Sequence, residues 1–248
     1  RQGYKIELEG STTSSFYGLR ATAGYQNRNI FRGAEALDIS FTVGYEYMKA
    51  EQARVRNAKE FGVTVGLQFP RFVLPFRMQR WQSIYQPKTR LEFGINYQDR
   101  PYYRRTLSSL SWTYTWTNRR YSSFSFRPID INVIDMGYLD QQFMDQLQNE
   151  YLINSYRSQF ISGLSFGYVY NNQRRNLGGN ATVLRFNFET AGNLIDGLEH
   201  LFSKPVAGED YYQIFGLRYS QYFRADLSIS HKVMLGEVSA LVGRLYGG

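Results

Sequence analysis

Chemically reactive side chains are scarce in this chain. Its 248 residues include no cysteine and only two histidines, His200 and His231. A Ser-His-Asp catalytic arrangement would therefore have to use a histidine from a predicted loop or turn. Asp196, Glu199 and His200 stand at helical spacing and could hold a cation, although such a cluster is more often a solvated helix face. The sequence predicts neither a catalytic centre nor a metal site.

Phosphate-binding motifs are also missing. The chain contains no P-loop and no Gly-x-Gly-x-x-Gly run. The net charge of +8 leaves nucleic acid, an anionic membrane surface or an acidic ligand open as partners, but no nucleic-acid-binding module is recognisable. Arginine pairs at 104–105, 119–120 and 174–175 either contact lipid phosphates or carry solvated loop charge. We therefore predict a protein that is not an enzyme, uses no cofactor and binds no nucleic acid.

The elements that would position these side chains follow a period of two. Between Leu37 and Tyr47, apolar and aromatic residues occupy the odd positions, and mostly polar residues occupy the even ones. Such an alternation indicates a β-strand with two chemically different faces. The same alternation recurs along the chain and predicts eleven long antiparallel strands, near residues 4–10, 16–28, 35–48, 60–69, 90–99, 107–117, 122–134, 160–171, 181–190, 211–229 and 233–246.

Long two-faced strands fit either a soluble or a membrane β-barrel. A soluble sandwich or lipid-binding barrel points aliphatic residues inward, on strands of about five or six residues. A membrane barrel points its apolar face at lipid, with strands of about 9–11 residues and aromatic residues near their ends. Here the alternation runs long, and aromatic residues make up 17% of the chain. We predict an all-β fold, a transmembrane antiparallel β-barrel, and keep the soluble barrel as the alternative.

The alternation also assigns a face to each residue of the predicted barrel. The even positions are rich in Gly, Ser, Thr, Asn and Gln, which suits a water-filled lumen. No stretch approaches the roughly 18 consecutive apolar residues that a membrane-spanning helix requires, so strands would cross the membrane. On the strand near 35–48, we expect one set of side chains to face lipid and the other to face the lumen: Leu37, Ile39, Phe41 and Val43 outward, and Asp38, Ser40 and Thr42 inward.

The predicted strands are joined by connections of two kinds. Two long connections have a helical pattern: residues 139–157 carry apolar residues at four-residue spacing, and Asn193 could cap a second helix. Short turns on one side and long external loops with short helices on the other are typical of outer-membrane barrels. Short polar turns are expected at residues 27–29, 117–120, 174–179 and 230–232.

The residues around the first of these turns resemble a known family. The run from Gly24 to Leu37 carries Asn29, Phe31 and Gly33 ahead of a strongly alternating strand. It resembles the second strand, first periplasmic turn and third strand of the BamA/TamA superfamily, the outer-membrane insertases related to the bacterial surface antigen family. The aromatic richness and the long loops look most like the versions found in Bacteroidetes-type bacteria.

The resemblance implies how much of the family architecture these residues hold. A second turn, Phe69-Pro70-Arg71-Phe72, is similar to the family's turn after the fourth strand, with Phe in place of Asn. Family barrels close with about sixteen strands, so residues 1–248 would be the N-terminal part of a transmembrane barrel domain. POTRA domains and the family's Arg-Gly-aromatic loop motif are not within these residues. We expect the natural chain to continue past Gly248 with that loop and about five more strands.

The resemblance also implies a function for the first strand. In the family, this strand pairs weakly with the closing strand, the seam opens as a lateral gate, and the exposed edge templates a strand of another barrel. The expected partners are outer-membrane lipids, unfolded outer-membrane proteins and accessory lipoproteins or periplasmic subunits, at the outer membrane of a bacterial cell. A passive channel or porin is the alternative. The positions that correspond to the gate strand are Tyr4, Lys5, Ile6, Glu7, Leu8 and Glu9.

Overall fold

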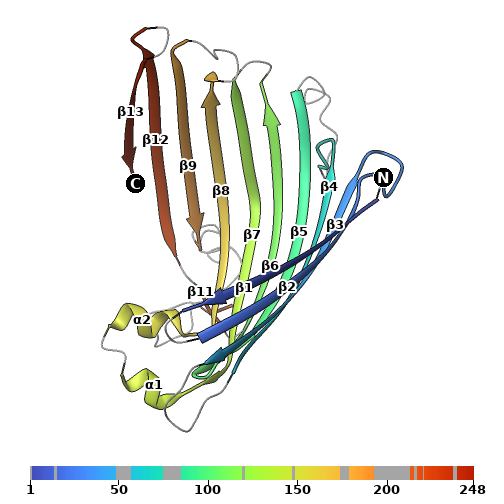
Figure 1. Ribbon diagram of the computed structural model, residues 1–248, viewed down its shortest axis with the longest axis vertical. Helices are drawn as coiled ribbons and strands as arrows, with labels where there is room; N and C mark the ends of the chain where they lie inside the picture. Colours follow the sequence, from blue (N-terminus) through green and yellow to red (C-terminus); the bar gives the residue numbers. More distant parts are fainter. Residues whose placement is uncertain are drawn as a thin grey trace.

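The described part of the chain forms one β-sheet with two short helices (Figure 1). Each long strand pairs with its neighbours in antiparallel fashion, so short connections can join one strand to the next. A computed structural model describes residues 2–13, 16–48, 57–74, 85–118, 121–146, 149–173, 179–192, 213–214, 217–219, 221–236 and 239–248.

Eleven long strands follow one another across the sheet, which confirms the predicted number and the antiparallel pairing. In the order of the sheet they are β1 (Gln2–Thr12), β2 (Phe16–Asn27), β3 (Ala36–Met48), β4 (Ala58–Phe69), β5 (Tyr85–Asp99), β6 (Tyr103–Thr117), β7 (Ser122–Leu139), β8 (Gln159–Asn171), β9 (Ala181–Ala191), β12 (Tyr222–Met234) and β13 (Ala240–Gly247). Two short strands, β10 (Gln213–Ile214) and β11 (Leu217–Tyr219), form a small hairpin, and β11 lies parallel to the start of β8.

The sheet is curved but not closed. β1 and β13 lie at its two ends and, within the described residues, do not pair with each other. Figure 1 shows β1 and β2 running obliquely in front of the strands at the centre of the sheet. The structure therefore shows a curved wall of antiparallel strands with two free edges.

The last two long strands begin and end later than predicted. Residues 211–229 do not form one strand, because β12 starts only at Tyr222. The turn predicted at 230–232 is wrong, since these residues pair with β9 on one side and with β13 on the other. The turn comes after β12, where the backbone N–H of Leu235 donates to the carbonyl of Ser239 at 2.9 Å. The polar residues at 230–232 belong to a paired strand rather than to a turn.

The connection between β7 and β8 is not the continuous helix predicted over 139–157. β7 extends to Leu139, and two short helices follow, α1 (Gln141–Asp145) and α2 (Glu150–Ser155). Asp140 ends the extended segment and caps α1, because its carboxylate accepts from the backbone N–H groups of Gln142 and Phe143 at 2.8 and 3.2 Å. The helical spacing was a correct signal for helix, but not for one continuous helix. The second predicted helix, starting at Asn193, lies outside the described residues.

The longest strand, β7, contains a proline in its interior. The register of β7 against β8 shifts between Arg127 and Asp130, on either side of Pro128. Proline has no N–H to donate to a ladder, and a β-bulge is a place where no donor is required. Arg127 and Asp130 form an ion pair across the bulge, with 2.6 Å between Nη1 and Oδ2. The bulge explains why the alternation of apolar residues shifts by one position in the middle of this strand.

The two faces of the sheet differ chemically, as the alternation predicts. We call the face that carries Phe41 the outer face and the face that carries Asp38 the inner face. On the outer face, large apolar side chains remain about half exposed: 49% for Phe41 and 47% for Phe93. On the inner face, polar side chains bond to one another across strands, as the Gln26 amide does to Asp38 at 2.7 Å. In the described residues, little apolar surface is buried within the sheet itself.

Candidate functional site

The first strand is an exposed edge over its whole length. β1 pairs with β2 from Gln2↔Asn27 to Thr12↔Tyr17. No described strand pairs with its other side, and every residue of β1 is exposed. Such an edge presents a row of backbone N–H and C=O groups that can bond to a further strand. The six residues predicted for the gate strand all lie on this edge.

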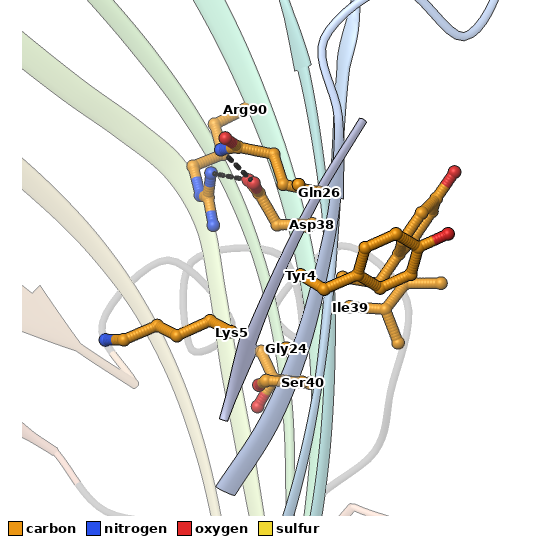
Figure 2. Close-up of a pocket in the computed structure, with 12 residues that line it drawn as sticks. Tyr4, Lys5, Gly24, Gln26, Asp38, Ile39, Ser40 and Arg90 are labelled. Atoms are coloured by element: carbon orange, nitrogen blue, oxygen red, sulfur yellow. Dashed lines mark hydrogen bonds and ion pairs between the residues drawn. The ribbon is translucent and has the colours of Figure 1, made fainter. Parts of the chain in front are cut away.

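Alternate side chains of β1 belong to the two faces of the sheet. Tyr4 lies on the outer face, where its ring is 5.3 Å from that of Tyr25 on β2, and Ile6 and Leu8 follow it on the same face. On the inner face, Lys5 forms an ion pair with Glu7. Figure 2 shows Lys5 and Tyr4 projecting from opposite sides of the strand. A strand that pairs with this edge would therefore have to alternate in the same way.

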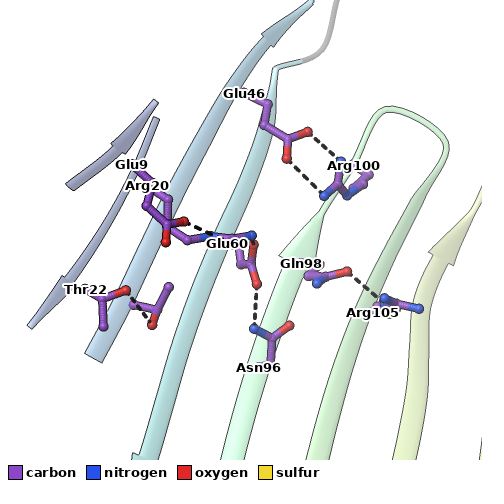
Figure 3. Close-up of polar contacts among 10 residues, drawn as sticks. Glu9, Arg20, Thr22, Glu46, Glu60, Asn96, Gln98, Arg100 and Arg105 are labelled. Carbon is purple, nitrogen blue, oxygen red and sulfur yellow. Dashed lines mark hydrogen bonds and ion pairs between the residues drawn. The ribbon is translucent and has the colours of Figure 1, made fainter. Parts of the chain in front are cut away.

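The inner face beside β1 carries an ion pair that spans three strands. Arg20 of β2 donates to Glu60 of β4, with Nη2 and Oε2 2.9 Å apart, and the Asn96 amide of β5 donates to Glu60 at 2.9 Å (Figure 3). Gly44 of β3 lies between Arg20 and Glu60 in the ladders. A Cβ at Gly44 would lie only 3.2 Å from Glu60 Cβ. Glycine thus leaves the space through which Arg20 reaches Glu60.

The same arrangement recurs toward the other end of these strands. Arg90 of β5 lies 3.0 Å from Asp38 of β3, and Gln26 of β2 completes the cluster (Figure 2). Arg90 also lies 2.8 Å from Glu92 on its own strand. Gly66 of β4 lies opposite Asp38. A Cβ at Gly66 would lie 2.5 Å from Nη2 of Arg90. Only glycine therefore allows the guanidinium to cross β4 in its present position.

A third ion pair lies at the same end of the strands as Arg20 and Glu60. Arg100, which directly follows β5, donates to both carboxylate oxygens of Glu46 on β3, at 2.6 and 3.2 Å (Figure 3). The small, buried Ala58 of β4 lies opposite Glu46. Burial lowers the pKa of Arg100, but the hydrogen bonds to Glu46 and its negative charge together have a larger, opposite effect. The pKa of Arg100 therefore lies above its usual value. The guanidinium therefore stays charged.

Small residues between these ion pairs leave the inner face hollowed. A hollow of about 400 Å³ is bordered by Arg20 and Glu60 and includes Gly62 and Gly94 in its lining. A second hollow, of about 350 Å³, lies beside Asp38. The inner face is thus a polar wall on which the described ion pairs balance positive with negative charge. Such a wall is suited to line a water-filled space.

The turn that carries the family resemblance is tightly bonded. The Gly33 N–H donates to the Glu35 carboxylate at 2.8 Å, and the Ala34 N–H donates to the Asn29 side chain at 3.0 Å. Ala34 has a φ of 61°, in the left-handed region that non-glycine residues rarely adopt. Phe31, by contrast, is 63% exposed. Asn29 and Gly33 hold the turn together, whereas Phe31 is presented from its surface.

Of the sequence-predicted candidates for catalysis or metal binding, the structure describes only His231. Asp196, Glu199 and His200 lie outside the described residues. His231 lies on β12, with its Nδ1 2.9 Å from the hydroxyl of Thr182 on β9. No group of three or more His, Asp or Glu that could hold a metal ion occurs among the residues that the structure describes. In the same part of the chain, no helix is long and apolar enough to cross a membrane.

The ion pairs of the inner face were not predicted from the sequence. The arginine pairs were expected either to contact phosphates or to carry solvated charge. In the one pair that is described, Arg104 lies 3.6 Å from Asp99, and Arg105 donates to Gln98 at 2.9 Å. A usable signal was present in the glycines at the even positions of the alternating strands. Gly66, for example, stands where a side chain from a neighbouring strand must cross.

Comparison with known proteins gave no match among family models, curated proteins or solved structures. The geometry of the sheet, its two faces and the edge strand β1 therefore carry the functional argument, together with the turn residues described above.

Proposed function

We propose that this chain forms the wall of a bacterial outer-membrane β-barrel that inserts other outer-membrane proteins into the membrane, with β1 as the strand that captures them. The observation that carries the proposal is the two-sided pattern of β1, an 11-residue strand that combines an apolar outer side with a charged inner side. The family resemblance of residues 24–37 supports the same function.

The membrane location is supported by the outer face. Phe41, Phe61 and Phe93 lie in the interior of the sheet, yet each remains about half exposed, at 49%, 48% and 47%. A large apolar side chain that stays half exposed to water forgoes about half of the 1.5–3 kcal/mol that full burial contributes, or about 1 kcal/mol. A continuous surface of this kind marks an interaction with lipid or protein. Lipid tails cover such a surface on a transmembrane barrel, and the polar inner face then lines the lumen.

The capture mechanism is supported by the cost of an unpaired edge in lipid. A backbone N–H or C=O group without a partner in hydrocarbon costs several kcal/mol. β1 is an 11-residue strand, so its free side offers a long row of such groups. An incoming strand that pairs with β1 removes this cost for both chains by β-augmentation. Unfolded outer-membrane proteins are therefore the proposed substrates.

The other partners of the proposed insertase would contact different parts of the sheet. Outer-membrane lipids would contact the outer face. The turn with the exposed Phe31 lies at the rim that the family resemblance assigns to the periplasm. Accessory lipoproteins or periplasmic subunits would meet the protein at this rim.

A passive channel is the second candidate function, because the inner face is polar and hollowed. The ion pairs Arg20–Glu60 and Arg100–Glu46 line it with fixed charges of both signs, and rings of charged side chains set the selectivity of membrane channels. A channel conducts along the axis of a closed barrel and has no use for an open edge at β1. The two functions therefore differ in what β1 contacts.

Site-specific crosslinking tests this difference. A photoreactive benzoylphenylalanine replaces Tyr4 on the edge strand in the full-length protein in its native membrane. The matched control replaces Tyr45, which lies on the same outer face but on the interior strand β3. An insertase is expected to crosslink newly made outer-membrane proteins at position 4 and not at position 45. A channel would give no protein-specific crosslink at either position, and that result would overturn the proposed function.

A further inference from the structure

The segment that follows β4 folds back onto the outer face of the sheet. The hydroxyl of Thr89 on β5 donates to the carbonyl of Arg71 at 2.8 Å and accepts from the backbone N–H of Val73 at 2.9 Å. The hydroxyl of Tyr114 on β6 donates to the carbonyl of Val73 at 2.8 Å. Side chains of the sheet thus satisfy three backbone polar groups of residues 70–74, which we call the outer-face segment.

This segment covers a place that would otherwise be open like the rest of the outer face. Thr89 and Tyr114 lie opposite each other in the ladder of β5 and β6, on the face that also carries Phe93. Phe93 is 47% exposed, whereas Tyr114 is 8% exposed and Thr89 is fully buried. The outer-face segment is therefore docked on the surface that the proposed function assigns to lipid.

Aromatic rings extend from this segment along the rim. The ring of Phe72 meets those of Tyr114 and Trp116 edge-on, with centroids 5.4 and 6.0 Å apart. Trp116 stacks on Phe124 at 5.2 Å, and Phe124 contacts Tyr168 at 5.2 Å. This row runs from the outer-face segment across β6, β7 and β8. Aromatic rows of this kind lie at the level of the lipid headgroups in membrane barrels.

The outer-face segment has the two properties that a chain lying at this level requires. Its bonded backbone groups point to the sheet, so they do not need water on the lipid side. Arg71 is exposed, and a guanidinium at the headgroup level can bind a phosphate through two hydrogen bonds. Phe72 and Leu74 then lie at the boundary of the acyl chains.

We propose that residues 70–74 form an interfacial anchor that lies flat on the outer face and holds the phosphate of an anionic lipid at Arg71. This inference rests on the proposed membrane location of the sheet. It goes beyond the insertase function, because it fixes the level of one bilayer interface at the rim where β4 ends and β5 begins.

Spin-label accessibility tests the anchor, and residues 1–248 contain no cysteine that would take up a second label. Nitroxides are attached to the full-length protein in Leu74→Cys, Phe41→Cys and Ser40→Cys variants in phosphatidylcholine vesicles, with or without phosphatidylglycerol. Oxygen reports exposure to lipid, and a nickel chelate reports exposure to water. We expect the label at 74 to be protected from nickel, as at 41 and unlike at 40, and to become more protected when phosphatidylglycerol is present.

The contribution of Arg71 is tested in the Leu74→Cys background. Arg71→Gln should abolish the effect of phosphatidylglycerol, whereas Arg28→Gln, a matched change in a turn at the same rim, should leave it intact. A nickel-accessible label at 74 beside a protected label at 41 would overturn the anchor and leave the membrane location standing. A nickel-accessible label at 41 would overturn the membrane location and the anchor together. An unchanged phosphatidylglycerol effect in Arg71→Gln would overturn the phosphate site.

Discussion

Replacing Phe41 by arginine should destabilise the protein far more than the same change at its neighbour Ser40. The two residues are adjacent on β3 but belong to opposite faces of the sheet. Phe41 pairs with Ala23 and Val63 in the ladders, and its side chain is 49% exposed on the outer face. Ser40 lines the inner hollow of about 350 Å³, which has space for a longer polar side chain.

The size of the effect follows from the position of Phe41 in the apolar band. Phe41 lies four residues from Leu37 and four from Tyr45, or about 14 Å along the strand in each direction. For a strand tilted by about 45°, this is about 10 Å below each interface and therefore close to the bilayer midplane. Arginine on the lipid face costs about 2–4 kcal/mol at this depth. At Ser40 the guanidinium would stay in the polar lumen, and we expect less than about 1 kcal/mol.

The assay is reversible urea unfolding of the full-length protein in lipid vesicles, followed by tryptophan fluorescence and by the heat-dependent shift of folded barrels on gels. The difference in unfolding free energy between the Phe41→Arg and Ser40→Arg variants measures how much more arginine costs on the outer face than on the inner face. Equal losses of unfolding free energy at the two positions would refute the assignment of the outer face to lipid.

Three further changes test individual contacts in the same unfolding assay. Thr89→Val should cost about 1–3 kcal/mol because it leaves buried backbone groups of the outer-face segment unpaired, whereas Thr89→Ser, which keeps the hydroxyl, should cost much less. Arg100→Ala should cost about 1 kcal/mol, because its ion pair with Glu46 is partly exposed. A loss above about 3 kcal/mol would contradict this and show that the pair stabilises the protein as a buried ion pair does. Gly33→Ala should cost about 1–2 kcal/mol, since the new methyl group would meet the buried Glu35 carboxylate and break its bond to the backbone; no loss would show that the turn tolerates a side chain there.

The strands could be predicted because each is long and has two different faces. The alternation from Leu37 to Tyr47 gave β3 almost to the residue, because one face is apolar along its whole length. The prediction of a turn at 230–232 was wrong. Ser230 and Lys232 are polar because both side chains belong to the inner face of β12, not because they form a turn. The alternation along one strand predicts well which face each side chain belongs to, but it predicts poorly where the strand ends.

The candidate site could be predicted only in part. The edge strand was predicted from its place in the chain and the family resemblance, and its role as a gate stays a prediction. The ion pairs were not predictable, because Arg90 and Asp38 are 52 positions apart and meet only through the register of three strands. The docking of Val73 on Thr89 likewise depends on a chain reversal after Pro70 that no periodic pattern encodes.

Locking β1 to the strand that closes the barrel against it tests the central claim most directly. One cysteine replaces Glu7, the other is placed on the closing strand of the full-length protein, and the disulfide forms only if the Cα atoms are within about 7 Å. A control lock joins Thr22→Cys and Thr42→Cys, whose hydroxyls already lie 3.3 Å apart on the paired strands β2 and β3. The rate at which cells assemble other outer-membrane barrels is then measured before and after reduction. We predict that the lock at Glu7 stops assembly until it is reduced, and that the control lock does not. Normal assembly with the Glu7 disulfide fully formed would contradict the role of β1 as a lateral gate.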